Sequence, residues 1–156
     1  MLGKGAFGEV YHGLLTDVAH QKEQLPVAVK TLPTICSDQM KSEFFMEAVM
    51  QSKLKHPNIV RFLGISIEIS SMVIVTELMN GGDLRYFVRQ FRTQHQDTVI
   101  DDLLQLCIDV ANGCQYLEEN GCIHRDIAAR NCLLTEKGPN RVVKVGDFGM
   151  SRIIGK

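Results

Sequence analysis

Residues 122–131 read Cys-Ile-His-Arg-Asp-Ile-Ala-Ala-Arg-Asn, and this stretch carries the most informative pattern in the chain. The acid Asp126 follows a basic pair, and the amide Asn131 comes five positions after the acid. Such an acid can accept the proton of an attacking hydroxyl group. Asn131 and the later acid Asp147, in Asp147-Phe148-Gly149, supply oxygen ligands of the kind that Mg²⁺ prefers. The stretch therefore predicts a site where a hydroxyl group, a cation and a nucleotide meet.

Each of these residues also has a plain structural interpretation. His124 could be a satisfied core histidine, Asp126 a turn residue and Asp147 a helix cap or loop acid. The combination of motifs in this order favours the functional interpretation, although His124 could be structural under either one.

A glycine-rich segment opens the chain, with Gly3, Gly5 and Gly8 in a Gly-x-Gly-x-x-Gly-x-Val pattern that ends at Val10. Glycines allow the backbone to approach phosphate groups closely and to present its N–H donors. Dinucleotide-binding folds use a similar triplet, but they follow it with a helix and with an acid about 20 residues later. Here a predicted strand follows, and Lys30 stands where the acid would be. A plain glycine turn is the structural alternative.

Lys30 and Glu47 are predicted to form an ion pair. Lys30 ends the strand Val27-Ala28-Val29-Lys30, so its stem is flanked by buried residues. Glu47 lies within an apolar stretch of a predicted helix, where an unpaired carboxylate is costly. Pairing solves both problems and would place the ammonium group near phosphate oxygens. The alternative is two unrelated surface charges.

The first half of the chain is predicted to be rich in strands, which are expected at residues 9–15, 27–32, 59–67 and 72–78. A polar hairpin loop is expected at residues 16–24. One helix interrupts the strands. It is expected to begin after a cap at Ser37 and to run to about Lys55, where His56-Pro57-Asn58 stops it.

The second half is predicted to be helical, and the change in pattern places a hinge near residues 78–82. Asp83 is expected to cap a short helix that ends at Gln90, and a loop at residues 91–98 should precede a long helix at residues 100–120. Gly121 is a natural residue to end that helix. Its buried stripe is expected to comprise Leu103, Leu106, Cys107, Val110, Cys114 and Leu117. Short extended segments are expected at residues 131–134 and 142–145.

Length and charge limit the classes of protein to which the chain can belong. The 156 residues are enough for one domain or two small lobes, and the apolar fraction of 45% is typical of a globular fold. The 17 basic and 18 acidic residues give a formal charge of −1, which provides no electrostatic argument for nucleic acid or an anionic membrane as a partner.

Together these motifs resemble the signature set of protein kinases, from Leu2 to Arg152. The resemblance implies an α+β, bilobal fold. Residues 1–79 would form a β-rich N-lobe with one long helix, residues 80–82 a hinge, and residues 83–156 the first part of a helical C-lobe. ATP and Mg²⁺ are the implied cofactors.

The resemblance also implies residue roles. Lys30 would bind the phosphates and pair with Glu47, Asp126 would be the catalytic base, and Asn131 and Asp147 would hold magnesium. The residues that would contact ATP are Leu2, Gly3, Gly5, Gly8, Val10, Ala28, Lys30, Thr76, Glu77, Met79, Asp83 and Leu133. Among these, Glu77 and Met79 would offer backbone bonds to adenine, and Asp83 would reach the ribose.

The subclass follows from the residues after the catalytic acid. Ala128-Ala129-Arg130-Asn131 resembles tyrosine kinases, which adds Arg130 to the catalytic set, whereas serine/threonine kinases generally have a lysine at position 128. Residues 77–84, 113–120 and 146–150 are similar to the receptor tyrosine kinases of the group containing anaplastic lymphoma kinase and leukocyte tyrosine kinase, within the insulin-receptor-like superfamily. Ros-type receptors are the second choice. The resemblance implies the cytoplasmic part of a single-pass plasma-membrane receptor, receptor dimerisation and protein substrates that contain tyrosine.

Two side chains depart from the family pattern. Gln51 stands one helical turn after Glu47, where the family usually has an apolar residue, so it needs a partner or costs stability. Thr76 precedes the hinge, where close relatives tend to have leucine, and it should leave a more open back pocket.

The C-terminal residues depart further. Ile153-Ile154-Gly155 replaces the usual Asp-Ile-Tyr, so this chain lacks an activation-loop tyrosine, and the chain stops at Lys156. We expect an incomplete kinase domain that alone is poorly stable and has little transfer activity. A non-catalytic nucleotide-binding scaffold is the alternative function, and a dinucleotide-dependent oxidoreductase is a distant third.

Overall fold

The computed structural model describes residues 1–5, 8–16, 24–33, 35–68, 71–93 and 100–154. These residues form two compact units. The first unit contains residues 1–54 and 61–78, and the second contains residues 55–60 and 79–156. The main chain passes between the units at Leu54–Lys55, Val60–Arg61 and Leu78–Met79, and the lobe boundaries that the family resemblance implies stay a prediction.

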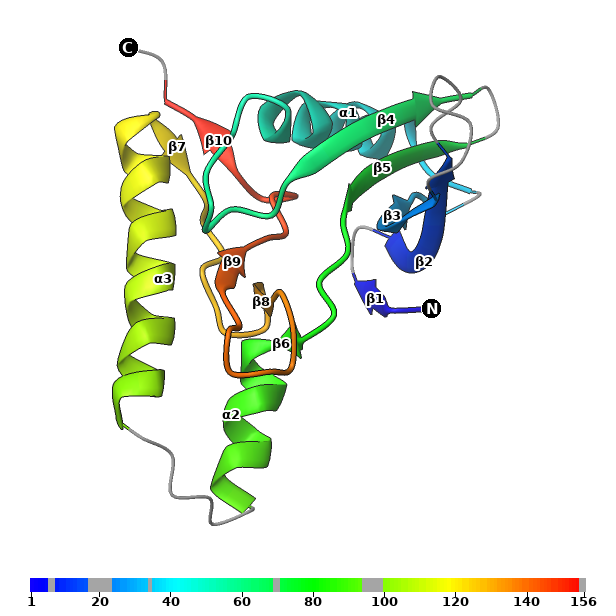
Figure 1. The fold of residues 1–156 in the computed structure, drawn as a ribbon. Helices are drawn as coiled ribbons and strands as arrows, with labels where there is room; N and C mark the ends of the chain where they lie inside the picture. The colour runs from blue at the N-terminus through cyan, green and yellow to red at the C-terminus, as the bar shows by residue number, and fades with distance from the viewer. Residues whose placement is uncertain (6–7, 17–23, 34, 69–70, 94–99, 155–156) are drawn as a thin grey trace. The chain divides into compact units, whose positions relative to one another are not determined.

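The first unit is an antiparallel sheet with one helix (Figure 1). The sheet has the order β1-β2-β3-β5-β4, and its strands are β1 (Gly3–Gly5), β2 (Gly8–Thr16), β3 (Gln24–Thr31), β4 (Phe62–Ile67) and β5 (Met72–Glu77). The helix α1 (Asp38–Gln51) packs beside β4. Its apolar face contributes Phe44 and Ala48, which are buried with Ile74 of β5. All four predicted strands are present, although the third begins later than predicted, and residues 17–23 of the predicted hairpin loop lie outside the described residues.

Local hydrogen bonds define both ends of α1. The side chain of Ser37 accepts a hydrogen bond from the N–H of Met40 and is the predicted N-cap. The helix ends at Gln51, so the predicted end near Lys55 was wrong. The reason is that the N–H groups of Lys53 and Leu54 bond the carbonyls three residues back, which tightens the chain into turns.

The second unit contains two helices and two small sheets (Figure 1). The helices are α2 (Leu84–Thr93) and α3 (Ile100–Glu119). One sheet has the order β6-β8-β9, with β6 (Gly82–Asp83), β8 (Cys132–Leu134) and β9 (Val143–Val145), and the other pairs β7 (Cys122–Ile123) with β10 (Arg152–Ile153). The fully buried side chains Leu134, Val143, Val145 and Phe148 lie in the core of this unit.

Two predicted helix boundaries in this unit are confirmed and one predicted loop is corrected. Asp83 caps α2, because its Oδ1 accepts the N–H of Tyr86 at 2.8 Å. Gly121 ends α3 with a φ of 61°, a left-handed conformation that favours glycine. Residues 91–93 of the predicted loop are helical, and residues 94–99 lie outside the described residues.

The predicted buried stripe of α3 was partly wrong. Leu106 and Leu117 are buried as predicted, but Cys107 is exposed and Asp109 is buried in its place. The carboxylate of Asp109 accepts the N–H of Val143 at 2.9 Å, so its burial is compensated by a bond to β9. Gly113 is also buried. It packs so closely against residue 58 that an added Cβ would lie 2.8 Å from the carbonyl oxygen of Asn58. The helix therefore turns a polar and a glycine position toward the core.

The predicted strand at residues 59–67 begins later than expected. Regular pairing starts at Phe62, and Ile59 instead makes an isolated parallel bridge with Val145. The N–H of Val60 donates to the carbonyl of Val145, and the N–H of Val145 donates to the carbonyl of Asn58. Because these hydrogen bonds are made with β9, residues 55–60 belong to the second unit.

Candidate active site

The first unit contains the predicted ion pair. The ammonium group of Lys30, in β3, donates to both carboxylate oxygens of Glu47, in α1, at 2.7 and 2.9 Å. The side chains are 17% and 3% exposed. Such charge-assisted bonds are stronger than bonds between neutral groups, and both charges are largely removed from water. The predicted pairing is therefore confirmed, and it fixes α1 against the sheet.

Gln51 completes the surroundings of Glu47. Its Nε2 donates to Oε1 of Glu47 at 3.4 Å, and its own Oε1 is buried without a hydrogen-bond partner among the described residues. The expected need for a partner is thus met on one side of the amide only. A buried acceptor left unsatisfied costs about 1–3 kcal/mol.

The sheet places four of the predicted ATP-contacting residues on one face. Directly paired residues of antiparallel strands point to the same side. The register pairs Val10 with Lys30 and Ala28 with Thr76, and Ala28 and Lys30 are two positions apart on β3. Val10, Ala28, Lys30 and Thr76 therefore share a face, although they come from three strands.

The glycine-rich segment forms the hairpin of β1 and β2, in which Gly5 pairs with Gly8. Gly8 has a φ of 131°, and a Cβ there would lie 1.9 Å from the carbonyl oxygen of Thr31. No other residue type fits this position without moving β3. Ala6 and Phe7, within the segment, lie outside the described residues.

Replacing Gly8 by alanine is expected to lower the free energy of unfolding by about 1–3 kcal/mol from backbone strain alone. Urea denaturation of the chain measures this change. Gly3→Ala is the matched control, because an added Cβ at Gly3 meets nothing within 4 Å, and its effect should stay within about 0.5 kcal/mol. Equal effects at both positions would contradict the assigned role of Gly8.

Leu2 and Glu77 also lie in the first unit. Leu2 is exposed, and its N–H donates to the carbonyl of Val10 at 2.7 Å. The side chain of Glu77 accepts the N–H of Arg61 at 2.7 Å, which holds the end of β5. The second unit contains Met79, Asp83 and Leu133, of which the last two pair directly across β6 and β8.

The second unit also holds the predicted catalytic acid in a network of donors. Oδ1 of Asp126 accepts from the guanidinium group of Arg130, and Oδ2 accepts from Nδ2 of Asn131 at 2.9 Å. The hydrogen bond from Asn131, followed by that from Arg130, holds the pKa of Asp126 below its ordinary value. The carboxylate is therefore ionised at neutral pH and its orientation is fixed by two side chains.

His124 connects the two loops of the site. Its Nδ1 accepts the N–H of Asp126 at 3.3 Å, and its Nε2 lies 3.0 Å from the carbonyl oxygen of Gly146. These two bonds require the neutral ring with the proton on Nε2. The imidazole is 4% exposed and packs edge-on against Phe148, with ring centroids 5.0 Å apart. Sequence reasoning left its role open, and its position inside the same motif was the only signal for this bridging role.

His124 should make the stability of the chain depend on pH. Burial lowers the pKa of His124, although the carbonyl of Gly146 and the charges of Asp147 and Asp126 oppose this shift. Because the pKa is lower in the folded chain, the unfolded chain binds the proton first as pH falls below about 6.5. As the pH is lowered through that range, the free energy of unfolding should decrease, by at most about 1.4 kcal/mol per pH unit. Denaturation at several pH values measures the slope, and His124→Asn should reduce it.

The surroundings of Asn131 and Asp147 are compatible with the predicted role of these residues as metal ligands. The Nδ2 of Asn131 donates to the carboxylate and to the carbonyl of Asp126, so its Oδ1 points away from that acid. The N–H of Gly146 donates to the carbonyl of Asn131 at 2.8 Å, which holds together the two segments that contain the predicted ligands. Asp147 is exposed with a φ of 58°, a conformation rare outside glycine. Two oxygen ligands suit Mg²⁺, which keeps several water and phosphate ligands. No group of three or more His, Cys, Asp or Glu side chains in the described part of the chain is arranged so that it could hold a metal ion.

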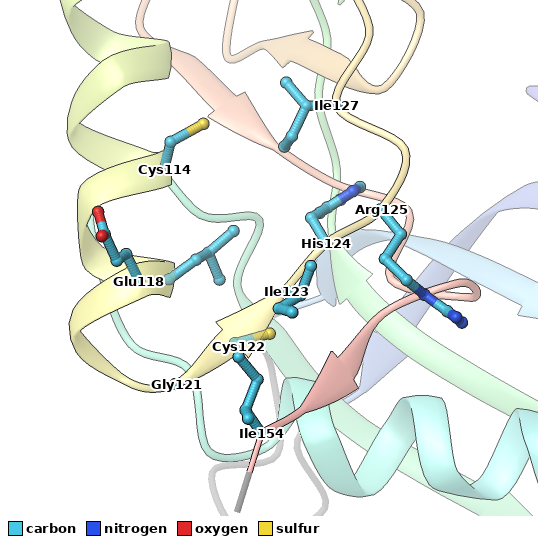
Figure 2. A pocket seen from close by; sticks show the side chains of 10 residues that line it. Cys114, Glu118, Gly121, Cys122, Ile123, His124, Arg125, Ile127 and Ile154 are labelled. Carbon is cyan, nitrogen blue, oxygen red and sulfur yellow. The ribbon is translucent and has the colours of Figure 1, made fainter.

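A pocket of about 280 Å³ opens on the second unit and is lined in part by residues that flank Asp126 (Figure 2). Its lining comes from α3, the β7–β10 pair and the segment after β7, and it includes Cys114, Leu117, Cys122, Ile123, Ile127 and Ile154. Burial raises the pKa of the Cys114 and Cys122 thiols, so they are protonated at neutral pH and poor nucleophiles. Glu118, His124 and Arg125 also line the pocket, but most of its lining is apolar and its two thiols are not suited to nucleophilic catalysis.

Comparison with known proteins identifies the family. The family model for protein tyrosine and serine/threonine kinases matches residues 1–156, and the chain belongs to this family. The α+β architecture and the Lys30–Glu47 pair agree with it.

The relatives include receptor tyrosine kinases. The chain is 54% identical to the leukocyte tyrosine kinase receptor of Mus musculus, over 98% of this chain and 18% of that protein. It is 47% identical to the proto-oncogene tyrosine-protein kinase ROS of Gallus gallus, over the whole chain and 7% of that protein. It is also 47% identical to the tyrosine-protein kinase transforming protein ros of UR2 avian sarcoma virus, over 40% of that protein. The predicted similarity to both receptor groups is confirmed, and the chain spans less than half of each relative.

None of the helices in the described residues is long and apolar enough to span a bilayer.

Proposed function

We propose that this chain is part of a protein-tyrosine kinase that transfers the γ-phosphoryl group of ATP to the hydroxyl group of a tyrosine in a protein. The observation that carries the proposal is the ionised Asp126 carboxylate, held by Arg130 and Asn131. The sequence of this segment resembles that of tyrosine kinases, and the names of the relatives describe tyrosine-protein kinases and a tyrosine kinase receptor.

In this mechanism the tyrosine oxygen attacks the γ-phosphorus of ATP while its proton moves to an oxygen of Asp126. The bond between the γ-phosphorus and the bridging oxygen breaks, ADP leaves with both electrons of that bond, and Asp126 later releases the proton to solvent. The two donors lower the basicity of Asp126. Its main task is therefore to orient the hydroxyl group and to receive the proton as the phosphoryl group is transferred.

Lys30 is the residue that we propose to bind the ATP phosphates. Its pairing with Glu47 keeps the ammonium group at a fixed position on the sheet, so little reorganisation is needed when the nucleotide binds. Gly3, Gly5 and Gly8 would cover the phosphates with backbone N–H groups. Asn131 and Asp147 would hold Mg²⁺, which supplies charge neutralisation at the phosphates.

The remaining proposed contacts concern the nucleoside. Val10, Ala28 and Leu133, with Leu2, would sandwich the adenine ring, and Thr76 would border its inner end. Glu77 and Met79 would offer backbone hydrogen bonds to the ring. Asp83 has one oxygen engaged as the cap of α2, and its other oxygen would reach the ribose.

The parent protein is proposed to be a single-pass receptor with this chain on the cytoplasmic side of the plasma membrane. Support comes from the names of the relatives, which include a leukocyte tyrosine kinase receptor. Receptor dimerisation and tyrosine-containing protein substrates belong to the same proposal.

The test pairs two measurements on one preparation of the parent protein's whole kinase domain, because this chain alone is expected to have little transfer activity. ATP binding is measured by calorimetry with Mg²⁺ present, and phosphoryl transfer is measured with radiolabelled ATP and a tyrosine-containing peptide. Binding with transfer to tyrosine supports the proposal, and transfer to serine alone would overturn the tyrosine assignment. Binding without transfer to any hydroxyl group would favour the nucleotide-binding scaffold.

A further inference from the structure

Gln51 carries an unusual hydrogen-bonding arrangement at the end of α1. It is the last residue of the helix and lies one turn after Glu47. Gln51 is 7% exposed, and its Nε2 donates to Oε1 of Glu47 at 3.4 Å. Its Oε1 is buried without a hydrogen-bond partner among the described residues. The side chain therefore satisfies the carboxylate while leaving its own acceptor unsatisfied.

The orientation of this amide is determined by its neighbour. Both oxygens of Glu47 accept hydrogen bonds from Lys30, so the carboxylate is a charged acceptor with no proton to donate. Rotating the amide by half a turn would place its oxygen against Oε1 of Glu47, and two acceptors would then repel each other. An apolar side chain would avoid the unsatisfied acceptor altogether, so the amide is a net benefit only through its bond to Glu47.

Glu47 needs an additional donor because of its place in the helix. It lies near the C-terminal end of α1, where the helix dipole disfavours a negative charge, and the last turn has no basic residue. The N–H groups of that turn are already used within the helix. A donor at position 51 reaches the carboxylate, since residues four apart lie on one face.

We propose that Gln51 is a positioning residue that holds the carboxylate of Glu47 in the orientation that pairs with Lys30. The proposal rests on the proposed function in one respect, since the pair serves ATP binding only if the chain is a kinase. Its local claim, that Gln51 tightens the Lys30–Glu47 pair, stands independently of catalysis.

The first test measures how well the pair protects Lys30. The chain is treated without nucleotide with a small amine-reactive reagent, and the modification rate of each lysine is followed by mass spectrometry. Gln51→Leu is expected to raise the rate at Lys30 several-fold and to leave that at the exposed Lys41 unchanged. The apparent ATP affinity should fall by up to about tenfold, the effect of losing one ordinary hydrogen bond. Gln51→Met serves if the leucine variant does not fold.

Gln39 provides a matched control on the same helix. Its Nε2 donates to Oε1 of Glu43 at 3.0 Å, which is also a glutamine–glutamate bond between residues four apart, but it is exposed. Gln39→Leu removes an equivalent bond from the same helix, and it should leave the Lys30 modification rate and the ATP affinity unchanged.

The second test uses the isosteric Gln51→Glu variant. Two adjacent buried carboxyl groups cannot both be ionised easily, so they would share one proton at low pH. The protonated carboxyl group donates as the amide does, whereas the ionised form repels Glu47. The ratio of the Lys30 modification rate in this variant to that in the unchanged chain should therefore rise with pH.

Three outcomes overturn the proposal. The first is an unchanged Lys30 rate in Gln51→Leu together with a pH-independent ratio in Gln51→Glu. The second is an equal rise at all lysines with a lower melting temperature, which indicates a purely structural role. The third is an equal rise at Lys30 in Gln39→Leu. If the unchanged chain does not bind ATP, the proposed function fails, while the Lys30 rates still decide the role of Gln51.

Discussion

In the parent protein's whole kinase domain, replacing Asp126 by asparagine is expected to lower the turnover number for phosphoryl transfer to a tyrosine-containing peptide by about 10²–10⁴-fold. The asparagine keeps the shape of the side chain but cannot receive the proton of the hydroxyl group. In the unchanged chain Arg130 and Asn131 each donate to one carboxylate oxygen of Asp126. The asparagine would turn its NH₂ group toward one of these two donors, so that hydrogen bond would be lost. Steady-state kinetics with radiolabelled ATP measure the loss.

The same substitution should change the dissociation constant for ATP only modestly, because Asp126 is proposed to contact the hydroxyl substrate. Calorimetry checks this expectation. Asp101→Asn is the control, since it makes the same chemical change at an exposed acid in the first turn of α3, and it should leave turnover unchanged. Unaltered turnover in Asp126→Asn would remove this residue from the role of base.

In the same whole kinase domain, replacing Lys30 by methionine is expected to lower kcat/KM by about 10²–10³-fold, the loss typical of removing one preorganised donor. The variant should also be less stable. Glu47 is 3% exposed and would become a buried charge without its main partner, and breaking such a pair costs about 3–5 kcal/mol. Kinetics and urea denaturation measure the two effects separately.

A double variant separates the function of Lys30 from its contribution to stability. Lys30→Met combined with Glu47→Leu removes both charges, so most of the lost stability should return, because apolar replacements of a buried pair are often neutral or stabilising. Activity should stay low, since the phosphate contact is still absent. Recovery of activity in the double variant would show that Lys30 acts only by neutralising Glu47.

Gln51 and His124 show how the site depends on side chains that are not proposed to contact a substrate. His124 bonds the backbone of Asp126 through one ring nitrogen and that of Gly146 through the other. Gln51 bonds the carboxylate that pairs with Lys30. Neither side chain is proposed to contact a substrate, yet each fixes the position of a residue that belongs to the proposed site.

Several features of the chain were determined by the sequence itself. The caps Ser37 and Asp83 and the helix end at Gly121 were predicted correctly, because each depends on backbone groups within one turn of the residue. The Lys30–Glu47 pair could also be predicted, since both side chains were expected to be buried and had opposite charge. The family was apparent from the order and spacing of the motifs.

Other features were decided by the tertiary structure. Asp109 replaces Cys107 on the buried face of α3 because β9 presents an N–H group that only an acceptor can satisfy. Ile59 leaves the expected strand because β9 offers it a bridge. The free acceptor of Gln51 and the tautomer of His124 follow from bonds to partners that sequence patterns do not specify. Local patterns report what a segment can do alone, whereas burial and pairing depend on which distant groups lie against it.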